Sequence, residues 1–277
     1  MIARERPSRL VVLGHPIAHS LSPAFQNAAL EHMGIPMRYE RMDVAPDALN
    51  ATMEALARER TGGNVTIPHK EAVAARARCS ELAKRVGAVN TFWFEDGTLV
   101  GHNTDVAGVT ETIRRFFASD LRGVECAVLG AGGSSAGVLV ALDGMGCDSI
   151  AVAARDADRA RRLVDRLGVR ARITTTGEDA VAGAGLVINT TPVGMNDDNV
   201  PVALASMKRD AAVFDLVYRR DETAWVRAAR AQGHRAIDGR DMLLEQGAAA
   251  FECWFGVTAP RDVMRAALSK AAAALAS

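Results

Sequence analysis

Short apolar segments alternate with longer segments of helical spacing through the first hundred residues. The apolar segments predict strands at residues 10–14, 37–44 and 63–67. The spacing of apolar positions predicts helices at residues 23–33 and 46–60. This alternation of strand and helix indicates a mainly parallel sheet that is covered by helices.

The first half ends at residues 92–100, which carry Glu-Asp-Gly at their centre and predict a hairpin with a tight turn. A second alternation begins near Val124, after a helical segment at residues 104–121 that connects the two halves. Further strands are expected at residues 126–130, 150–154, 186–189 and 213–216, and further helices at residues 134–145, 156–167, 240–255 and 260–275. The sequence therefore predicts an α/β protein that ends in helices.

Composition narrows the class of protein. The length of 277 residues suggests about two domains. Lys plus Arg and Asp plus Glu both number 33, so the formal net charge is zero, which argues against a nucleic-acid partner. No uncharged apolar run approaches the roughly 18 residues of a membrane span, and the polar first residues lack an apolar signal core. Four cysteines without a C-x-x-C pair favour a reduced, cytoplasmic setting over a zinc ribbon or disulfide scaffold.

A glycine-rich segment follows the expected strand at residues 126–130 and opens the next helix. It reads Gly130-Ala131-Gly132-Gly133-Ser134. Glycines allow a tight turn and a close approach to a pyrophosphate, and the following helix N-terminus favours negative charge. The strand-turn-helix context predicts dinucleotide binding at this segment.

The end of the next strand bears on the choice of cofactor. An acidic residue there usually bonds the ribose 2′-hydroxyl of NAD. This chain has Arg155 and Arg159 instead, and at a spacing of four residues they can share one helix face. Two guanidinium groups suit a 2′-phosphate, so NADP is favoured. Asp156 then serves as a helix N-cap or opposes the phosphate.

Two other sequence patterns suggest different chemistry. Residues 133–137 fit G-x-S-x-G, the nucleophile elbow of hydrolases, and Asp215 and His234 follow Ser135 in the order of a catalytic triad. No H-G-G-G oxyanion segment precedes this pattern, so a serine hydrolase is a remote alternative. His15 and His19 are four residues apart, but Pro16 argues against the helix that metal binding would need. We therefore expect no metal site.

Polar residues gather at the ends of expected elements in the first half of the chain. These clusters lie at residues 20–22, 64–70, 87–91 and 101–105, and they supply hydroxyls, amides, one lysine and one carboxylate. Together they suggest a polyhydroxylated acid as the ligand.

Seven motifs stand out along the chain, namely Gly14-His-Pro-Ile-Ala-His-Ser-Leu-Ser-Pro23, Asn64-Val-Thr-Ile-Pro-His-Lys70, Gly87-Ala-Val-Asn-Thr91, Gly101-His-Asn-Thr-Asp105, Gly130-Ala-Gly-Gly133, Ile188-Asn-Thr-Thr-Pro-Val-Gly-Met195 and Asp238-Gly-Arg-Asp-Met-Leu-Leu-Glu-Gln246. In these motifs the chain resembles the shikimate dehydrogenase family. They occur in family order over nearly the whole chain. One departure is that the family usually reads Asn-Arg-Thr where this chain has Ala154, Arg155 and Asp156.

The resemblance implies a substrate-binding α/β domain at residues 1–104 that helices at residues 240–277 complete, and a Rossmann-type NADP-binding domain at residues 105–239. By motif match, the implied catalytic pair is Lys70 and Asp105. The implied substrate ligands are Ser20, Ser22, Thr66, Asn90, Tyr218 and Gln246. The implied cofactor residues are Gly130, Ala131, Gly132, Gly133, Ser134, Arg155, Arg159, Leu216 and Gly239.

The expected activity is the reversible NADPH-dependent reduction of 3-dehydroshikimate to shikimate, a step in the biosynthesis of chorismate and aromatic amino acids, by a monomer or homodimer. A quinate or quinate/shikimate dehydrogenase that uses NAD is the alternative within the same fold. A non-catalytic sensor would be expected to lack the lysine or the aspartate, and both are present.

Overall fold

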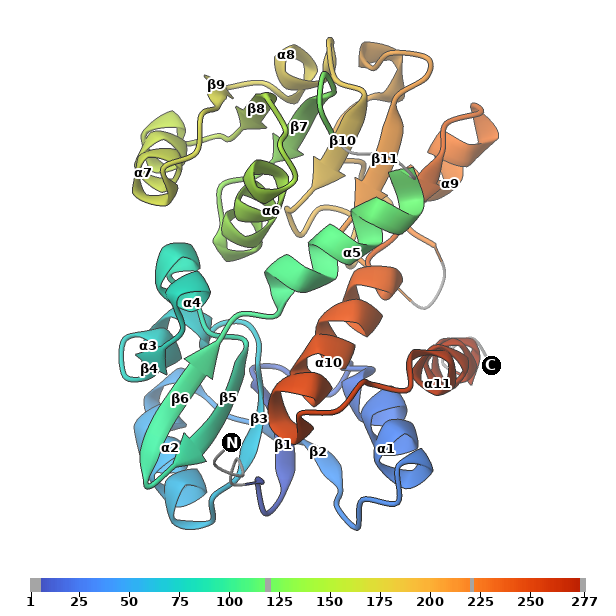
Figure 1. Ribbon diagram of the computed structural model, residues 1–277. Helices are drawn as coiled ribbons and strands as arrows, with labels where there is room; N and C mark the ends of the chain where they lie inside the picture. The colour runs from blue at the N-terminus through green and yellow to red at the C-terminus, as the bar shows by residue number, and fades with distance from the viewer. Residues whose placement is uncertain (1–5, 118–120, 220–221, 275–277) are drawn as a thin grey trace. The chain divides into compact units, whose positions relative to one another are not determined.

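The chain forms two compact units, and each is described by itself. The computed structural model describes residues 6–117, 121–219 and 222–274 (Figure 1). Unit 1 comprises the chain up to Gly108 and again from Leu243, and unit 2 comprises Val109–Met242. The domain boundaries expected at residues 104/105 and 239/240 lie within four residues of these changes, and the roles assigned to the domains stay predictions.

Unit 1 is built on a six-stranded mixed sheet with the order β2-β1-β3-β5-β6-β4. Its strands are β1 (Leu10–Gly14), β2 (Tyr39–Asp43), β3 (Gly62–Val65), β4 (Arg78–Cys79), β5 (Thr91–Glu95) and β6 (Thr98–His102). The predicted parallel arrangement is found for β1, β2 and β3, whereas β5 runs antiparallel to both of its neighbours. The predicted hairpin is confirmed as β5 and β6, with positive φ at Asp96 and Gly97 in its turn.

Helices from both ends of the chain contribute to unit 1. They are α1 (Ser22–His32), the short 3₁₀ turn η1 (Pro46–Ala48), α2 (Leu49–Arg58), α3 (Lys70–Ala74), α4 (Glu81–Val86), α10 (Arg240–Phe255) and α11 (Arg261–Ala274). α11 packs beside α1, as Figure 1 shows. The Trp254 indole of α10 donates to the Phe92 carbonyl over 3.2 Å. The C-terminal helices therefore return to the first part of the chain, as the resemblance implied.

A buried carboxylate joins the last two helices. The Glu245 side chain on α10 is 1% exposed and pairs with two arginines of α11. Arg261 Nε lies 3.0 Å from Oε2, and Arg265 Nη2 lies 3.1 Å from Oε1. Since a buried charge is tolerated only when it is paired, this contact holds α11 against α10.

Unit 2 is a parallel six-stranded sheet with the order β12-β11-β10-β7-β8-β9. Its strands are β7 (Glu125–Leu129), β8 (Ser149–Ala153), β9 (Arg172–Thr174), β10 (Leu186–Asn189), β11 (Ala212–Asp215) and β12 (Ala236–Ile237). Its helical segments are α5 (Asp105–Phe117), which starts in unit 1, α6 (Gly133–Gly144), α7 (Ala157–Leu167), α8 (Gly177–Val181), η2 (Leu204–Ser206) and α9 (Ala224–Ala231). The strand order reverses between β7 and β10, which is the switch point where doubly wound sheets bind ligands.

The sequence missed several short elements, namely α3, α4, β4, β9, α8, α9 and β12. Most have two to six residues, so they show too little periodicity to be recognised. Side-chain caps mark some of these helices instead: Ser80 caps α4, Thr176 caps α8 and Thr223 caps α9. Among the described helices, none is both long and apolar enough to cross a bilayer.

A close approach of two strands in unit 1 requires Gly63. A Cβ atom at this position would lie 2.1 Å from the carbonyl oxygen of Val11, its partner in the β1–β3 ladder. The backbone cannot rotate away without breaking the ladder. We therefore expect Gly63→Ala to destabilise the fold by about 2 kcal/mol or more, as overpacking does in other cores.

Urea denaturation measures this effect, with Gly144→Ala as the control. A Cβ at Gly144, in the last turn of α6, meets no atom within 4 Å, so this substitution should stabilise by up to about 1 kcal/mol. Wild-type stability of Gly63→Ala would contradict the close approach.

Candidate active site

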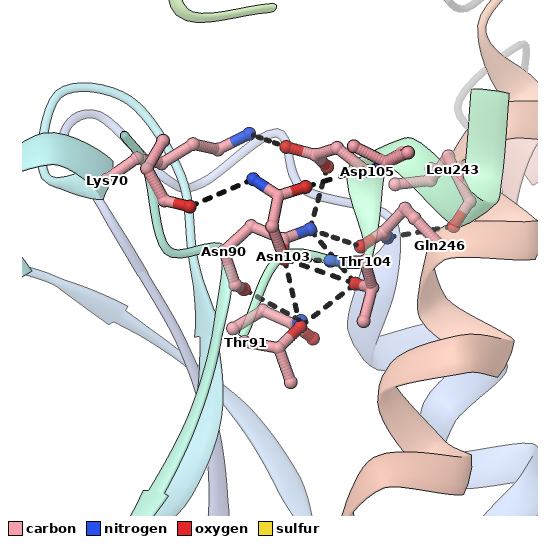
Figure 2. A network of polar contacts seen from close by, with 11 residues as sticks. Lys70, Asn90, Thr91, Asn103, Thr104, Asp105, Leu243 and Gln246 are labelled. Atoms are coloured by element: carbon pink, nitrogen blue, oxygen red, sulfur yellow. Dashed lines mark hydrogen bonds and ion pairs between the residues drawn. The ribbon is translucent and has the colours of Figure 1, made fainter. Parts of the chain in front are cut away.

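An ion pair between two helix starts lies at the centre of the candidate site in unit 1. Lys70 is the first residue of α3, and Asp105 is the first residue of α5. Lys70 Nζ lies 2.6 Å from Asp105 Oδ2, and the side chains are 20% and 14% exposed (Figure 2). The pair is thus sheltered from solvent yet still within reach of a small molecule.

The buried Asn90 side chain orients this ion pair. It is 2% exposed, and its Nδ2 lies 2.7 Å from Asp105 Oδ1, 3.0 Å from Thr104 Oγ1 and 3.3 Å from Gln246 Oε1. Its Oδ1 accepts the backbone N–H of Thr104 over 2.7 Å. Asn90 therefore fixes one carboxylate oxygen of Asp105 and leaves the other to Lys70.

Gln246 reaches the same cluster from α10. Its Nε2 donates to the carbonyl of Leu243 over 2.9 Å, which turns its Oε1 toward Asn90, as Figure 2 shows. The structure thus brings together four residues that are distant in sequence, namely Lys70, Asn90, Asp105 and Gln246.

Two charged side chains of β2 hold the loop that carries Ser20 and leads to Ser22, the first residue of α1. Arg41 donates from Nε and Nη2 to the Ser20 carbonyl over 2.9 and 2.6 Å. Asp43 accepts from the His15 ring over 2.6 Å and from the Ile17 N–H over 3.4 Å, and the His15 hydrogen bond lowers the pKa of this carboxyl. His15 is therefore a partner of Asp43.

The loop between β3 and α3 places Thr66 and Lys70. The Thr66 N–H donates to the Leu13 carbonyl over 2.8 Å, and the Thr66 carbonyl accepts from the His69 N–H over 2.9 Å. The buried His69 ring lies with Nε2 2.6 Å from the Val44 carbonyl oxygen. These contacts anchor the residue that precedes Lys70.

The glycine-rich turn of unit 2 fits a dinucleotide. Gly130 has a φ of +114°, and a Cβ there would lie 2.7 Å from Thr190 Oγ1, so the turn requires glycine. A Cβ at Gly132 or Gly133 would meet no protein atom within 4 Å. The open space in front of the first N–H groups of α6 therefore suits the phosphates of a nucleotide.

The residues expected to select the cofactor follow β8. Arg155 and Arg159 are exposed, but Arg155 precedes α7, so the expectation that both lie on one helix face is wrong. Asp156 is the N-cap of α7, and its Oδ1 accepts the N–H of Arg159 over 2.9 Å. The acid is thus engaged with the helix backbone, while both guanidinium groups are exposed to solvent.

The other predicted residues of unit 2 lie around the end of β11. The Leu216 N–H donates to the Asn189 carbonyl over 3.0 Å, and the Gly239 N–H donates to the Val217 carbonyl over 3.2 Å, so Gly239 lies beside this turn. Tyr218 is half-buried, and burial raises the pKa of its phenol. Tyr218 belongs to unit 2, whereas the other predicted substrate ligands belong to unit 1.

The structure contradicts the hydrolase alternative. The Ser135 hydroxyl is buried, lies 2.6 Å from Thr190 Oγ1 and accepts the Gly132 N–H over 3.0 Å. His234 Nδ1 lies 2.9 Å from the Ala211 carbonyl oxygen, and Asp215 accepts from Asn189 and Thr223. Each residue of the supposed triad therefore has other partners.

Four residues that are hydrogen-bonded to Asn90 or to its partners had no role assigned from the sequence, namely Tyr39, Asn64, Thr91 and Thr104. Asn64, Thr91 and Thr104 stand in motifs that carried the family resemblance. Tyr39 stands in none, so nothing in the sequence distinguished it from a core aromatic residue.

The fold and the glycine-rich turn define the class of protein as a dinucleotide-binding α/β protein. Two family models match the chain, the shikimate dehydrogenase substrate binding domain at residues 12–92 and the shikimate 5'-dehydrogenase C-terminal domain at residues 239–268. The chain belongs to the shikimate dehydrogenase family.

Individual relatives agree over nearly the full length. The NADP(+) shikimate dehydrogenase of Methanopyrus kandleri is 41% identical and that of Mesorhizobium japonicum 43% identical, over 93% and 91% of this chain and 93% and 92% of theirs. The crystal structure of the Thermus thermophilus shikimate 5-dehydrogenase with NADP(H) and shikimate has a TM-score of 0.85 and 37% identity. That comparison covers 95% of this chain and 99% of the other.

The Ser135 hydroxyl stabilises the glycine-rich turn through its contact with Gly132. Ser135→Ala removes the acceptor of the Gly132 N–H and loosens the turn, so we expect the KM for the dinucleotide to rise by about three- to tenfold, the scale of one hydrogen bond. The kcat should change less than the KM. Steady-state kinetics measure both values, and covalent labelling of wild-type Ser135 by a fluorophosphonate would contradict the structural role.

Proposed function

We propose that this protein catalyses the reversible NADPH-dependent reduction of 3-dehydroshikimate to shikimate, with Lys70 and Asp105 as its catalytic pair. The observation that carries the proposal is the 2.6 Å ion pair, whose carboxylate Asn90 also holds. Family membership and relatives named as NADP(+) shikimate dehydrogenases support the same activity.

Lys70 is the residue that acts on the reacting oxygen. NADPH, when bound, supplies the hydride that reduces the substrate. Negative charge then develops on the substrate oxygen, and the Lys70 ammonium stabilises this charge and donates the proton. In the opposite direction the neutral amine accepts the proton. Asp105 orients the ammonium through Oδ2 and accepts a hydrogen bond from a ring hydroxyl.

The remaining residues of unit 1 recognise the substrate. Ser20 and Ser22, each 5% exposed, donate their hydroxyl hydrogens to the carboxylate. Thr66, Asn90 and Gln246 bond the ring hydroxyls. Tyr218, from unit 2, completes the set that we propose as substrate ligands.

Unit 2 binds the cofactor in this proposal. Gly130 and Gly132 donate their N–H groups within the protein, so the other N–H groups of the turn at residues 130–134 bond the pyrophosphate. Arg155 and Arg159 pair with the 2′-phosphate. Leu216 and Gly239 line the nicotinamide end. Because the Asp156 carboxylate caps α7, it competes little with the 2′-phosphate for the two guanidinium groups.

The setting that we propose is the cytoplasm, because all four cysteines have free thiols. The active form is a monomer or homodimer.

A spectrophotometric assay with two substrates and two cofactors tests the function. We expect NADP reduction with shikimate to be the fastest of the four combinations of shikimate or quinate with NADP or NAD. Faster reduction of NAD with quinate would identify a quinate dehydrogenase, and no reduction in any combination would overturn the proposal.

Lys70 provides the sharpest test of the mechanism. Lys70→Met keeps the length of the side chain but removes its charge and proton, so kcat should fall by at least about 100-fold. The KM for shikimate should stay within about threefold, because the charge matters most as the oxyanion develops. The matched control is Lys84→Met, an exposed lysine paired with Glu81, which should keep wild-type kcat. Equal kcat values for the two variants would exclude Lys70.

Arg155 tests the choice of cofactor. Arg155→Ala should lower kcat/KM for NADP by about ten- to a hundredfold, the scale of one charged hydrogen bond, and change that for NAD little. Arg161→Ala removes another exposed arginine, paired with Asp158 on α7, and should affect neither cofactor. Equal losses with NADP and NAD would show that Arg155 does not read the 2′-phosphate.

A further inference from the structure

A buried tyrosine lies beneath the candidate site of unit 1. Tyr39, the first residue of β2, is 1% exposed, and its ring packs against Trp254 at 6.0 Å between centroids. Burial raises the pKa of the phenol, and the nearby Ser22 side chain partly opposes this shift. Tyr39 therefore stays a neutral hydrogen-bond donor.

The Tyr39 hydroxyl donates to Asn64. Its oxygen lies 2.7 Å from Asn64 Oδ1, although the two residues stand on strands that β1 separates. Asn64 Nδ2 donates in turn to the Asn90 carbonyl and to Thr91 Oγ1, each over 3.0 Å. All polar atoms of the Asn64 amide are thus engaged, and the phenolic donor selects which way the amide faces.

Both contacts of Asn64 lead to the catalytic pair. One fixes the backbone of Asn90, the residue whose side chain lies 2.7 Å from Asp105 Oδ1. The other fixes Thr91, whose Oγ1 lies 2.9 Å from Thr104 Oγ1 (Figure 2). Thr104 also donates its N–H to Asn90, so the two routes meet at the residue before Asp105.

We propose that Tyr39 and Asn64 are positioning residues for the catalytic pair, and that they support Asn90, Asp105 and Lys70 through one hydrogen-bonded network. The inference rests on the proposed function, in which Ser22 holds the carboxylate and Lys70 acts on the reacting oxygen. Neither Tyr39 nor Asn64 needs to touch the substrate for this role.

The physical reason is the cost of an unpaired polar atom in the interior. Without the phenolic hydroxyl, Asn64 Oδ1 is buried with no donor, so the amide must turn or shift to find one. Its two donated hydrogen bonds to Asn90 and Thr91 then weaken together, because members of a buried network depend on one another. A small displacement of Asp105 and Lys70 follows, and reaction rates are sensitive to displacements of this size.

The primary experiment measures the environment of Lys70 without any substrate. Tyr39→Phe keeps the ring and removes only the hydroxyl. Limited acetylation with acetic anhydride, read by mass spectrometry, gives the rate at Lys70 relative to Lys84, an exposed internal reference. We expect the relative rate at Lys70 to rise by about threefold or more in Tyr39→Phe, because its ion pair with Asp105 loosens.

The control is Thr61→Val, which removes another buried hydroxyl of unit 1. Thr61 is 0% exposed and contacts Glu59, outside the network. This variant should label Lys70 as the wild type does. An unchanged Lys70 rate in Tyr39→Phe, or an equal rise in Thr61→Val, would overturn the proposal.

Kinetics provide the second readout. Tyr39→Phe should lower kcat for shikimate oxidation by about tenfold. Thr61→Val should keep the wild-type kcat, even where it loses as much stability as Tyr39→Phe or more. Adding Thr91→Val to Tyr39→Phe should lower kcat by less than the product of the two single effects, since both act through Asn64. Independent, multiplicative effects would contradict a single network.

Failure of the proposed function has a different signature. A wild type that oxidises no shikimate overturns the function, while the acetylation rates still decide whether Tyr39 positions Lys70. An active wild type with unchanged labelling and unchanged kcat in Tyr39→Phe overturns only the positioning role.

Discussion

The candidate site of unit 1 depends on the requirement that buried polar side chains be fully hydrogen-bonded. Asn90 is 2% exposed, and its amide contacts the side chains of Thr104, Asp105 and Gln246 at once. Such an amide has few alternative arrangements, because each would leave a buried donor or acceptor unpaired. The same constraint that keeps the interior intact therefore fixes the geometry of the ion pair between Lys70 and Asp105.

The two units present polar groups by different means. Unit 1 uses side chains at the ends of strands and at helix starts, so the identity of each residue matters for its chemistry. Unit 2 uses the backbone N–H groups of a glycine-rich turn and the start of α6, so the absence of side chains matters there. This difference explains why Ser135 can look like a nucleophile in sequence and yet serve the turn, where its oxygen accepts the Gly132 N–H.

β2 shows how one edge strand can serve the site over its whole length. Its buried first residue, Tyr39, bonds inward to Asn64, while Arg41 and Asp43 bond to the loop that leads into α1 and carries Ser20. The hydrophobic core beneath the sheet supplies the rigid support that these contacts need. Hydrogen bonds alone contribute modest net stability, and their value here is in orientation.

Sequence alone determined most of the architecture and supplied most residues of the candidate site. The long strands and helices follow from the spacing of apolar residues, and the glycine turn after β7 predicted the dinucleotide-binding unit. Short elements such as α3 and β4 were missed, because a few residues carry no periodic signal. The roles proposed for Lys70 and Asp105 came from the family motifs, since each residue taken singly is compatible with an ordinary surface position.

Only the tertiary structure decided the contacts between residues that are distant in sequence. It brought Gln246 to Asn90 across 156 positions of the chain and Tyr39 to Asn64 across a strand. It also showed that Arg155 precedes α7 and that Asp156 caps this helix. Sequence patterns record local spacing, whereas the partner of a polar side chain is set by which strands and helices pack together, and that packing is a property of the whole fold.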